Sequence, residues 1–354
     1  QGYLWIGTTY GGLNRFDRRT GQFTVYKHVP GDATSLSNNS VRQIYEDRSG
    51  QMWIGTNGGG LCEFDRATGK FRTFRHDPGN PGSLSHNQIR SIHEDRSEVL
   101  WIGTFGGGLN RFDRKREIFT HFMHDESDSG SLSHNIIRHV YEDLSETLWI
   151  ATYGGGLNKF DRKTNRFTHY RADPDDPTKL SNDYIFVIYE DYSHQLWVGT
   201  WGGGLNRFDK KSETFHRYSV DDGLPSNSIY GILEDSQRNL WISTTNGLSR
   251  FNLDTKTFRN FQRSDGLQSN EFNGGAFYKS LSGEMFFGGI DGFNAFYPDT
   301  IKDNSYIPPI AITAFQKMNR AVILDRPITA VREISLSYKD YFFSFEFTAL
   351  DFTR

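Results

Sequence analysis

The sequence has a single cysteine, almost no net charge and no long apolar run. One cysteine among 354 residues excludes a disulfide framework. The 40 Lys and Arg residues nearly balance the 43 Asp and Glu residues, and the formal net charge of −3 argues against a nucleic-acid partner. The longest apolar runs are a few residues, far short of the roughly 20 that cross a bilayer. Contact with a membrane is therefore expected only through segments outside this sequence.

Glycine and aromatic residues are abundant instead, with 36 Gly, 29 Phe, 17 Tyr and 7 Trp, and they recur with a fixed period. Five tryptophans are spaced 48 residues apart, and Trp241 and then Phe286 follow at intervals of 44 and 45. The five are Trp5, Trp53, Trp101, Trp149 and Trp197. A period of this length indicates seven copies of one structural unit.

Each complete repeat predicts four short strands separated by turn residues, for example at 41–47, 52–56, 60–65 and 71–75. The Leu-Trp-Ile-Gly-Thr segment is apolar on both sides, as expected for a strand between two neighbouring sheets. Four-stranded sheets packed face to face predict an all-β, seven-bladed β-propeller. Repeat 1 lacks its first strand and repeat 7 lacks a clear fourth, so ring closure must join remote ends or use residues outside this segment.

Two recurring motifs are assigned to the fold rather than to chemistry. The Glu-Asp pairs at 46–47, 94–95, 142–143, 190–191 and 234–235 begin a turn in each repeat, where Asp commonly bonds turn backbone. The Gly-Gly-Gly loops precede a strand rather than a helix, which argues against a phosphate loop and for tight turns. No catalytic pair, metal site or cofactor is predicted.

The residue before each glycine loop differs from repeat to repeat, and this variation marks it as a candidate ligand-binding position. Aromatic faces at the mouth of the ring would suit the apolar face of a sugar, and amides would bond its hydroxyls. The alternative is that these rings only cover gaps between blades. The set comprises Tyr10, Asn57, Phe105, Tyr153, Trp201 and Asn246.

A second variable position lies on the first strand. Three adjacent repeats carry arginine and the next two carry aromatic residues, which predicts a cationic side facing an aromatic side, suited to a carboxylated or sulfated glycan. The alternative is that each arginine pairs with an acidic residue between blades. The set comprises Arg42, Arg90, Arg138, Phe186 and Tyr230, with Asn273 at the equivalent place in repeat 7.

The repeat consensus resembles the two-component regulator propeller family. In repeat 3 its three motifs are residues 87–95 (Asn-Gln-Ile-Arg-Ser-Ile-His-Glu-Asp), 100–104 (Leu-Trp-Ile-Gly-Thr) and 107–113 (Gly-Gly-Leu-Asn-Arg-Phe-Asp). After residue 298 the pattern stops, and residues 308–315, 334–336 and 341–350 resemble the start of the immunoglobulin-like sandwich that follows such propellers. We therefore expect a propeller over 1–304 and a partial sandwich over 305–354.

This resemblance implies the periplasmic sensor region of a membrane-bound hybrid sensor histidine kinase. It implies a small-molecule or oligosaccharide ligand, and a homodimer formed through the sandwich whose geometry relays the signal to the kinase. No enzymatic activity is expected of this segment. Two alternatives stay open: a propeller enzyme of the lyase type, and a protein-docking scaffold.

Overall fold

The structure is a computed structural model that describes residues 2–301 and 309–349. The chain divides into two compact units, Gln1–Thr300 and Ile301–Arg354. The predicted boundary between 304 and 305 falls outside the described residues. Strands dominate both units. The helical segments of the described residues are short 3-10 turns: η1 Val220–Asp222, η2 Arg263–Asp265, η3 Pro298–Thr300 and η4 Ile328–Ala330.

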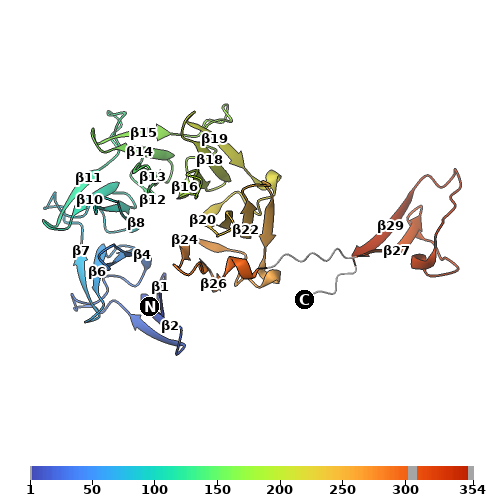
Figure 1. The fold of residues 1–354 in the computed structure, drawn as a ribbon, viewed down its shortest axis with the longest axis horizontal. Coiled ribbons are helices and arrows are strands. Elements are labelled where there is room, and N and C mark those ends of the chain that lie inside the picture. Colours follow the sequence, from blue (N-terminus) through green and yellow to red (C-terminus); the bar gives the residue numbers. More distant parts are fainter. Residues whose placement is uncertain (1, 302–308, 350–354) are drawn as a thin grey trace. The chain divides into compact units, whose positions relative to one another are not determined.

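The first unit is a ring of seven antiparallel sheets within residues 2–301, which confirms the predicted propeller (Figure 1). The two end blades have three strands each: β1 Tyr3–Gly7, β2 Leu13–Asp17 and β3 Gln22–Tyr26 in the first, and β24 Phe272–Lys279, β25 Met285–Gly289 and β26 Gly292–Phe296 in the seventh.

The five blades between them have four strands each. The second blade contains β4 Val41–Glu46, β5 Met52–Thr56, β6 Leu61–Asp65 and β7 Lys70–Phe74. The third contains β8 Ile89–Glu94, β9 Leu100–Thr104, β10 Leu109–Asp113 and β11 Ile118–Phe122. The fourth contains β12 Ile137–Glu142, β13 Leu148–Thr152, β14 Leu157–Asp161 and β15 Arg166–Tyr170. The fifth contains β16 Ile185–Glu190, β17 Leu196–Thr200, β18 Leu205–Asp209 and β19 Thr214–Tyr218, and the sixth β20 Ile229–Glu234, β21 Asn239–Thr244, β22 Gly247–Asn252 and β23 Phe258–Phe261.

The first strands lie at the axis of the ring and the fourth strands at its rim (Figure 1). Consecutive first strands contact one another from β4 through β8, β12, β16 and β20 to β24. Residues that leave the plane of a blade at its first strand are therefore brought together at the axis, as the repeat pattern predicted.

The second strand of each complete blade is buried along its whole length. Its tryptophan donates Nε1–H to the Asp that follows the first strand, at 2.7–2.9 Å in all five complete blades. In the second blade Asp47 also accepts from the backbone N–H groups of Ser49 and Gln51. The recurring Glu-Asp pairs are thus structural, as predicted, and they orient the central tryptophan as well as the turn.

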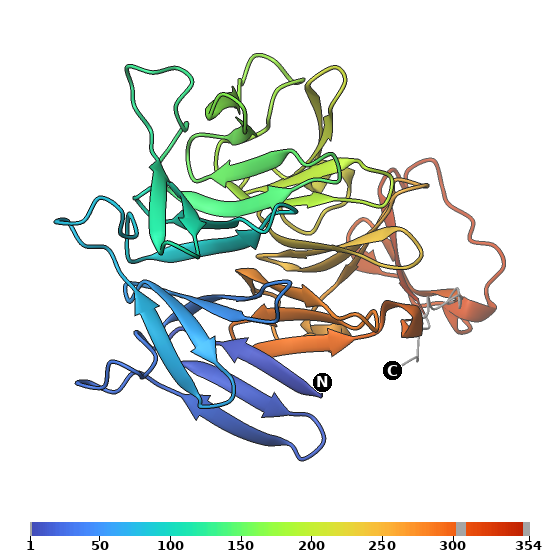
Figure 2. The same cartoon turned by 60° about the vertical axis from the view of Figure 1, so that its left-hand side comes forward.

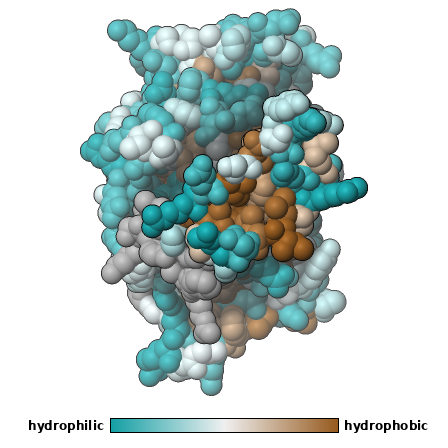
Figure 3. Space-filling view, turned by 90° about the vertical axis from the view of Figure 1, so that its right-hand side faces the viewer, coloured by the Kyte–Doolittle hydropathy of each residue, from teal (hydrophilic) through white to brown (hydrophobic). Residues whose placement is uncertain are grey.

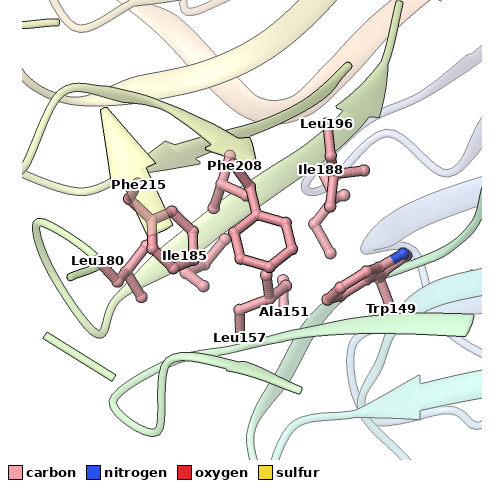
Figure 4. Close-up of a cluster of buried hydrophobic side chains, with 10 residues drawn as sticks. Trp149, Ala151, Leu157, Leu180, Ile185, Ile188, Leu196, Phe208 and Phe215 are labelled. Carbon is pink, nitrogen blue, oxygen red and sulfur yellow. The ribbon is translucent and has the colours of Figure 1, made fainter. Parts of the chain in front are cut away.

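Neighbouring blades share apolar cores. Between the fourth and fifth blades, Trp149 and Leu157 of one blade pack with Ile188 and Phe208 of the next (Figure 4). Full burial of one such side chain stabilises the fold by about 1.5–3 kcal/mol. The sequence must therefore be apolar on both faces of the central strands.

In the third, fourth and fifth blades a basic residue in the turn after the third strand pairs with the blade before it. Arg114 of the third blade pairs with Asp47 of the second blade and with Glu94 of its own blade. The same bridge recurs at Arg162 with Asp95 and Glu142, and at Lys210 with Asp143 and Glu190. The sequence analysis did not predict these ion pairs between consecutive blades, which we call the ladder of ions.

The sixth blade interrupts that ladder, because Leu253 stands where the basic residue would be. Glu234 is 1% exposed and forms no ion pair with a cation within residues 2–301 or 309–349. Burial, together with the nearby Asp191 carboxylate, raises the pKa of Glu234 to about 7, although the backbone N–H of Tyr192 donates to it at 2.9 Å.

The ring closes between the first and seventh blades, which lie side by side (Figures 1 and 2). Within residues 2–301 no strand passes from one of these two sheets to the other. Instead Arg18 forms a bidentate ion pair with Glu284, at 2.5 and 2.9 Å. Glu284 supplies the carboxylate here because Ser280 occupies the place of the usual Asp and Phe286 that of the usual Trp.

The second unit contains one described sheet, in the order β28 Arg320–Ala321, β27 Ile310–Lys317 and β29 Phe343–Ala349. Phe315 is buried, but Ile310, Phe343 and Phe347 are exposed, and Figure 3 shows apolar residues gathered among polar ones on the face that it views. A sandwich consists of two packed sheets. The predicted immunoglobulin-like sandwich therefore stays a prediction.

Candidate functional site at the axis of the ring

A β-bulge on the first strand of each complete blade presents one side chain at the axis. The pairing of first and second strands shifts register at this point in all five complete blades. A bulge re-aims its extra residue away from the regular pleat. The bulge residues are the variable first-strand set, namely Arg42, Arg90, Arg138, Phe186 and Tyr230.

The residues before the glycine loops lie beside these bulges. The backbone N–H of Tyr153 donates to the carbonyl of Ile136, two residues before Arg138, at 2.9 Å. The same bond joins Asn57 to Ser40, Phe105 to Gln88 and Trp201 to Tyr184, at 2.8–2.9 Å. The two variable sets that the sequence kept apart therefore meet at one end of the ring.

Four aromatic residues of the two sets form one contiguous group. The rings of Tyr153 and Trp201 stack with centroids 5.7 Å apart, and Phe186 lies 6.1 Å from Tyr153 and 5.1 Å from Tyr230. Trp201 remains 45% exposed, so part of its surface is available to a ligand. Exposed aromatic faces of this kind accept the apolar face of a sugar ring.

Arg90 and Arg138 lie against aromatic rings rather than against acidic side chains. The guanidinium of Arg138 lies 4.0 Å from the ring centroid of Phe186, and that of Arg90 lies 4.9 Å from that of Phe105. Within residues 2–301 and 309–349, no ion pair joins Arg42, Arg90 or Arg138 to a carboxylate. The alternative that each of them pairs with a neighbouring acid is therefore wrong.

Burial and mutual repulsion act on these cations. Desolvation is the larger cause of the lowered pKa of Arg138, about 10, and the positive charge of Arg90 is the next. The pKa of Arg90 is lowered in the same way, first by desolvation and then by the charge of Arg42. The Nε of Arg90 is buried and donates to no acceptor among the described residues. The guanidinium of Arg138 stays protonated at neutral pH, since its lowered pKa lies far above 7.

Gly274 of the seventh blade shows how closely the side chains approach across the axis. A Cβ on Gly274 would lie 2.8 Å from Cδ1 of Phe186 and 3.1 Å from Nη2 of Arg138. A larger residue at this position would displace both side chains. The neighbouring Asn273, also predicted to face the axis, lies in the irregular part of β24.

Two predicted residues lie outside this group. Tyr10 is 86% exposed and has no ring neighbour within the described residues, and the side-chain amide of Asn246 donates to the carbonyl of Pro225 at 3.1 Å. Asn57 does belong to the group, with its Oδ1 3.5 Å from Nη2 of Arg90. We call the converging residues the axial cluster: Arg42, Asn57, Arg90, Phe105, Arg138, Tyr153, Tyr184, Phe186, Trp201 and Tyr230.

Three residues beside the axial cluster's predicted members were missed. Tyr184 lies 4.6 Å from Tyr153, ring to ring. His86 and His134 accept a backbone N–H at Nδ1, from Gln88 at 3.2 Å and from Ile136 at 3.1 Å, which leaves the proton on Nε2. Burial lowers the pKa of both histidines, so they act as neutral donors. The shared position of the two histidines, three residues before the first strand of their blades, was the signal that could have identified them.

Four segments match the model of the two component regulator propeller family, at residues 35–58, 83–106, 179–202 and 223–246. Histidine kinase P4 from Formosa agariphila is 27% identical over 138 residues, which cover 37% of this chain and 10% of that protein. Three of the matched segments end on the glycine directly after a variable residue, and the fourth ends on the variable residue Asn246 itself.

Two solved structures from B. thetaiotaomicron, both extracellular domains of proteins assigned to hybrid two-component systems, resemble almost the whole chain. One is 27% identical with a TM-score of 0.77 and covers 99% of this chain and 45% of its own. The other is 25% identical with a TM-score of 0.67 and covers 98% and 46%. Streptogramin B lyase, 15% identical with a TM-score of 0.61 and covering 83% of this chain and 89% of its own, shares the fold alone.

The chain thus spans less than half the length of these extracellular domains and a tenth of the curated kinase. No helix of the described residues is long and apolar enough to cross a membrane. Four segments of the chain thus match the two component regulator propeller family, and its propeller is similar to the extracellular domains of hybrid two-component systems.

Proposed function

We propose that this chain is the ligand-receiving part of a periplasmic sensor region, and that its ligand is an oligosaccharide bound at the axial cluster. Binding there changes how two copies of the C-terminal unit associate, and this change is passed across the membrane to a histidine kinase. The chain itself performs no chemistry on the ligand.

One observation carries the ligand part of this proposal: positions that vary between repeats converge at one end of the axis, while positions that recur serve the fold. Phe186, Trp201 and Tyr153 supply aromatic faces, and Asn57 supplies an amide beside them. Specificity that is confined to the variable residues of a repeat protein is typical of a binding surface. The similarity to extracellular domains of two-component systems favours a sensor over other binding proteins.

The proposal that ligand binding changes the association of two copies rests on the C-terminal unit. Its sheet exposes Ile310, Phe343 and Phe347, which are 70%, 48% and 69% exposed. Apolar residues concentrated on one small sheet favour association with another surface. Analytical ultracentrifugation with and without bound oligosaccharide tests the relay, and an association constant that the ligand leaves unchanged would contradict it.

A library of oligosaccharides screened by thermal shift, followed by calorimetry of the hits, tests the ligand. We expect Trp201→Ala and Tyr153→Ala to weaken binding by about 10-fold each, because each removes a stacking face. Tyr10→Ala is the matched control, since Tyr10 holds the same place in its repeat but lies outside the axial cluster. Equal losses in all three variants would place the ligand elsewhere.

The same experiment separates binding from catalysis. After prolonged incubation with the protein, the bound oligosaccharide should be recovered unchanged by mass spectrometry. Cleavage that disappears in a variant of the axial cluster would instead establish an enzyme.

A further inference from the structure

We infer that the ligand of the axial cluster carries a negatively charged group, a carboxylate or a sulfate, that binds beside Arg90 and Arg138. This inference rests on the proposed function and adds the chemical class of the ligand to it. The aromatic half of the cluster then holds the sugar ring that bears this group.

The charge balance of the axial cluster carries the inference. Elsewhere in the ring the partly buried Arg114 and Arg162 each contact two carboxylates. Arg42, Arg90 and Arg138 approach one another closely enough to lower the pKa of the inner two, yet no described carboxylate pairs with any of them. The fold therefore neutralises its structural arginines and leaves these three for another partner.

Arg90 provides a second, independent sign. Its Nε is buried without an acceptor among the described residues, and the one side-chain hydrogen bond of Arg90 within those residues is a long one, 3.5 Å from Nη2 to Oδ1 of Asn57. An unsatisfied buried donor on a charged group is costly to the protein. An anionic ligand that accepts from Arg90 removes this cost on binding, and a neutral ligand removes less of it.

The surroundings favour an acidic sugar over a small inorganic anion. The rings of Phe186 and Phe105 lie 4.0 and 4.9 Å from the guanidiniums of Arg138 and Arg90, and His86 and His134 add neutral N–H donors nearby. Cations, aromatic faces and neutral donors thus lie within one cluster. A uronic acid or sulfated sugar presents the complementary anion, apolar ring face and hydroxyls, whereas an inorganic anion uses only the cations.

Matched ligands test the inference by calorimetry on the intact chain. We would compare an oligogalacturonate with its methyl ester, and a sulfated disaccharide with its desulfated form, so that each pair differs in charge alone. We expect the charged member of one pair to bind at least about 10-fold tighter, which corresponds to one charged hydrogen bond. The carboxylate and sulfate arms distinguish the two sources of charge.

Substitutions of single arginines test which residues produce the preference for the charged ligand. Arg90→Met and Arg138→Met should each abolish most of the preference for the charged member while retaining binding of the neutral one. Arg42→Met, on the exposed side chain of the trio, gives the same test if the inner variants fold poorly. Arg116→Met is the control, because Arg116 is an exposed turn residue paired only with Asp113.

The outcomes separate the inference from the proposed function. Neutral and charged members that bind equally, or neutral members that bind more tightly, overturn the inference and leave an oligosaccharide sensor in place. A charge preference that survives in both Arg90→Met and Arg138→Met also overturns it. If no member of either pair binds, and no oligosaccharide of the wider library does, the proposed function fails together with the inference.

Discussion

The five complete blades and the two end blades are held by different interactions, although all seven derive from one repeat. In the complete blades an aspartate joins its turn, its tryptophan and, in three cases, a cation from the next blade. In the seventh blade serine and phenylalanine replace that aspartate and tryptophan, and Glu284 meets Arg18 of the first blade. An ion pair thus also joins the first and seventh blades, but through different residues.

This difference shows which parts of the repeat depend on one another. The tryptophan needs an acceptor for its Nε1–H because it is buried, and the aspartate provides it. Where the tryptophan becomes Phe286, that acceptor is no longer needed and Ser280 replaces it. The need for a carboxylate between blades persists, and Glu284, four residues after Ser280, meets it.

The largest effect is expected from removing the aspartate in a complete blade. Asp95→Ala leaves Trp101 Nε1 without its acceptor, removes one of the two carboxylates that pair with Arg162, and frees two backbone N–H groups. We expect a loss of about 3–5 kcal/mol in the free energy of unfolding, as for other broken buried pairs. Urea unfolding followed by tryptophan fluorescence measures it.

The control for that change is Ser280→Ala at the equivalent place of the seventh blade. The Ser280 hydroxyl accepts from the backbone N–H of Glu284 and shares an exposed hydrogen bond with the Ser282 hydroxyl, neutral bonds worth about 1 kcal/mol each. Equal losses in the two variants would show that the aspartate does not hold the complete blades together.

A second effect is expected where the ladder of ions is interrupted inside the complete blades. The pKa of Glu234 is raised from 4.5 to about 7, so the folded protein binds more protons than the unfolded chain between these pH values. Stability should therefore fall as pH rises from about 4.5 to 7, by at most about 3 kcal/mol. Unfolding free energies measured across this range test the sign.

Leu253→Lys places the missing cation beside Asp191 and Glu234 and should flatten this pH dependence. Glu234→Gln removes the titrating group and should flatten it as well. A slope that persists in both variants would assign the pH dependence to other groups.

The sequence predicted the architecture well because a repeat exposes its own constraints. Strand bounds such as 52–56 were correct because Trp53 and its neighbours recur in every copy, and the same recurrence separated structural residues from variable ones. The ion pairs between blades were missed because Arg114 and Asp47 lie 67 residues apart, and only the curvature of the ring brings them together.

The axial cluster was predicted in part for a similar reason. Variation between repeats identified Arg138, Phe186 and Trp201, but it could not show that the loop set and the strand set meet. It also could not show that Tyr10 lies outside the cluster or that the arginines lack acids. Each of these depends on which side chain a bulge or a loop brings to the axis.

A moderate effect is expected at the joint between the end blades. Arg18→Met removes the bidentate pair with Glu284, but Arg18 is 48% exposed, so we expect only about 1 kcal/mol of lost stability. The local effect should be larger, with faster hydrogen exchange in β2 and β25 than in β9. Arg19→Met is the neighbouring control, and unchanged exchange in the Arg18 variant would mean that apolar packing alone closes the ring.

The smallest effect is expected at the tryptophan of the first blade. Trp5 is only partly buried, and its Nε1 donates to no described acceptor, whereas Trp101 is 1% exposed and bonded to Asp95. Trp5→Phe should therefore cost less than about 1 kcal/mol, while Trp101→Phe should cost about 1–3 kcal/mol because it removes one of the two donors to the buried Oδ2 of Asp95. Equal costs would mean that the repeat needs only an aromatic ring at this position, and that the bond to aspartate adds nothing to the stability of the complete blades.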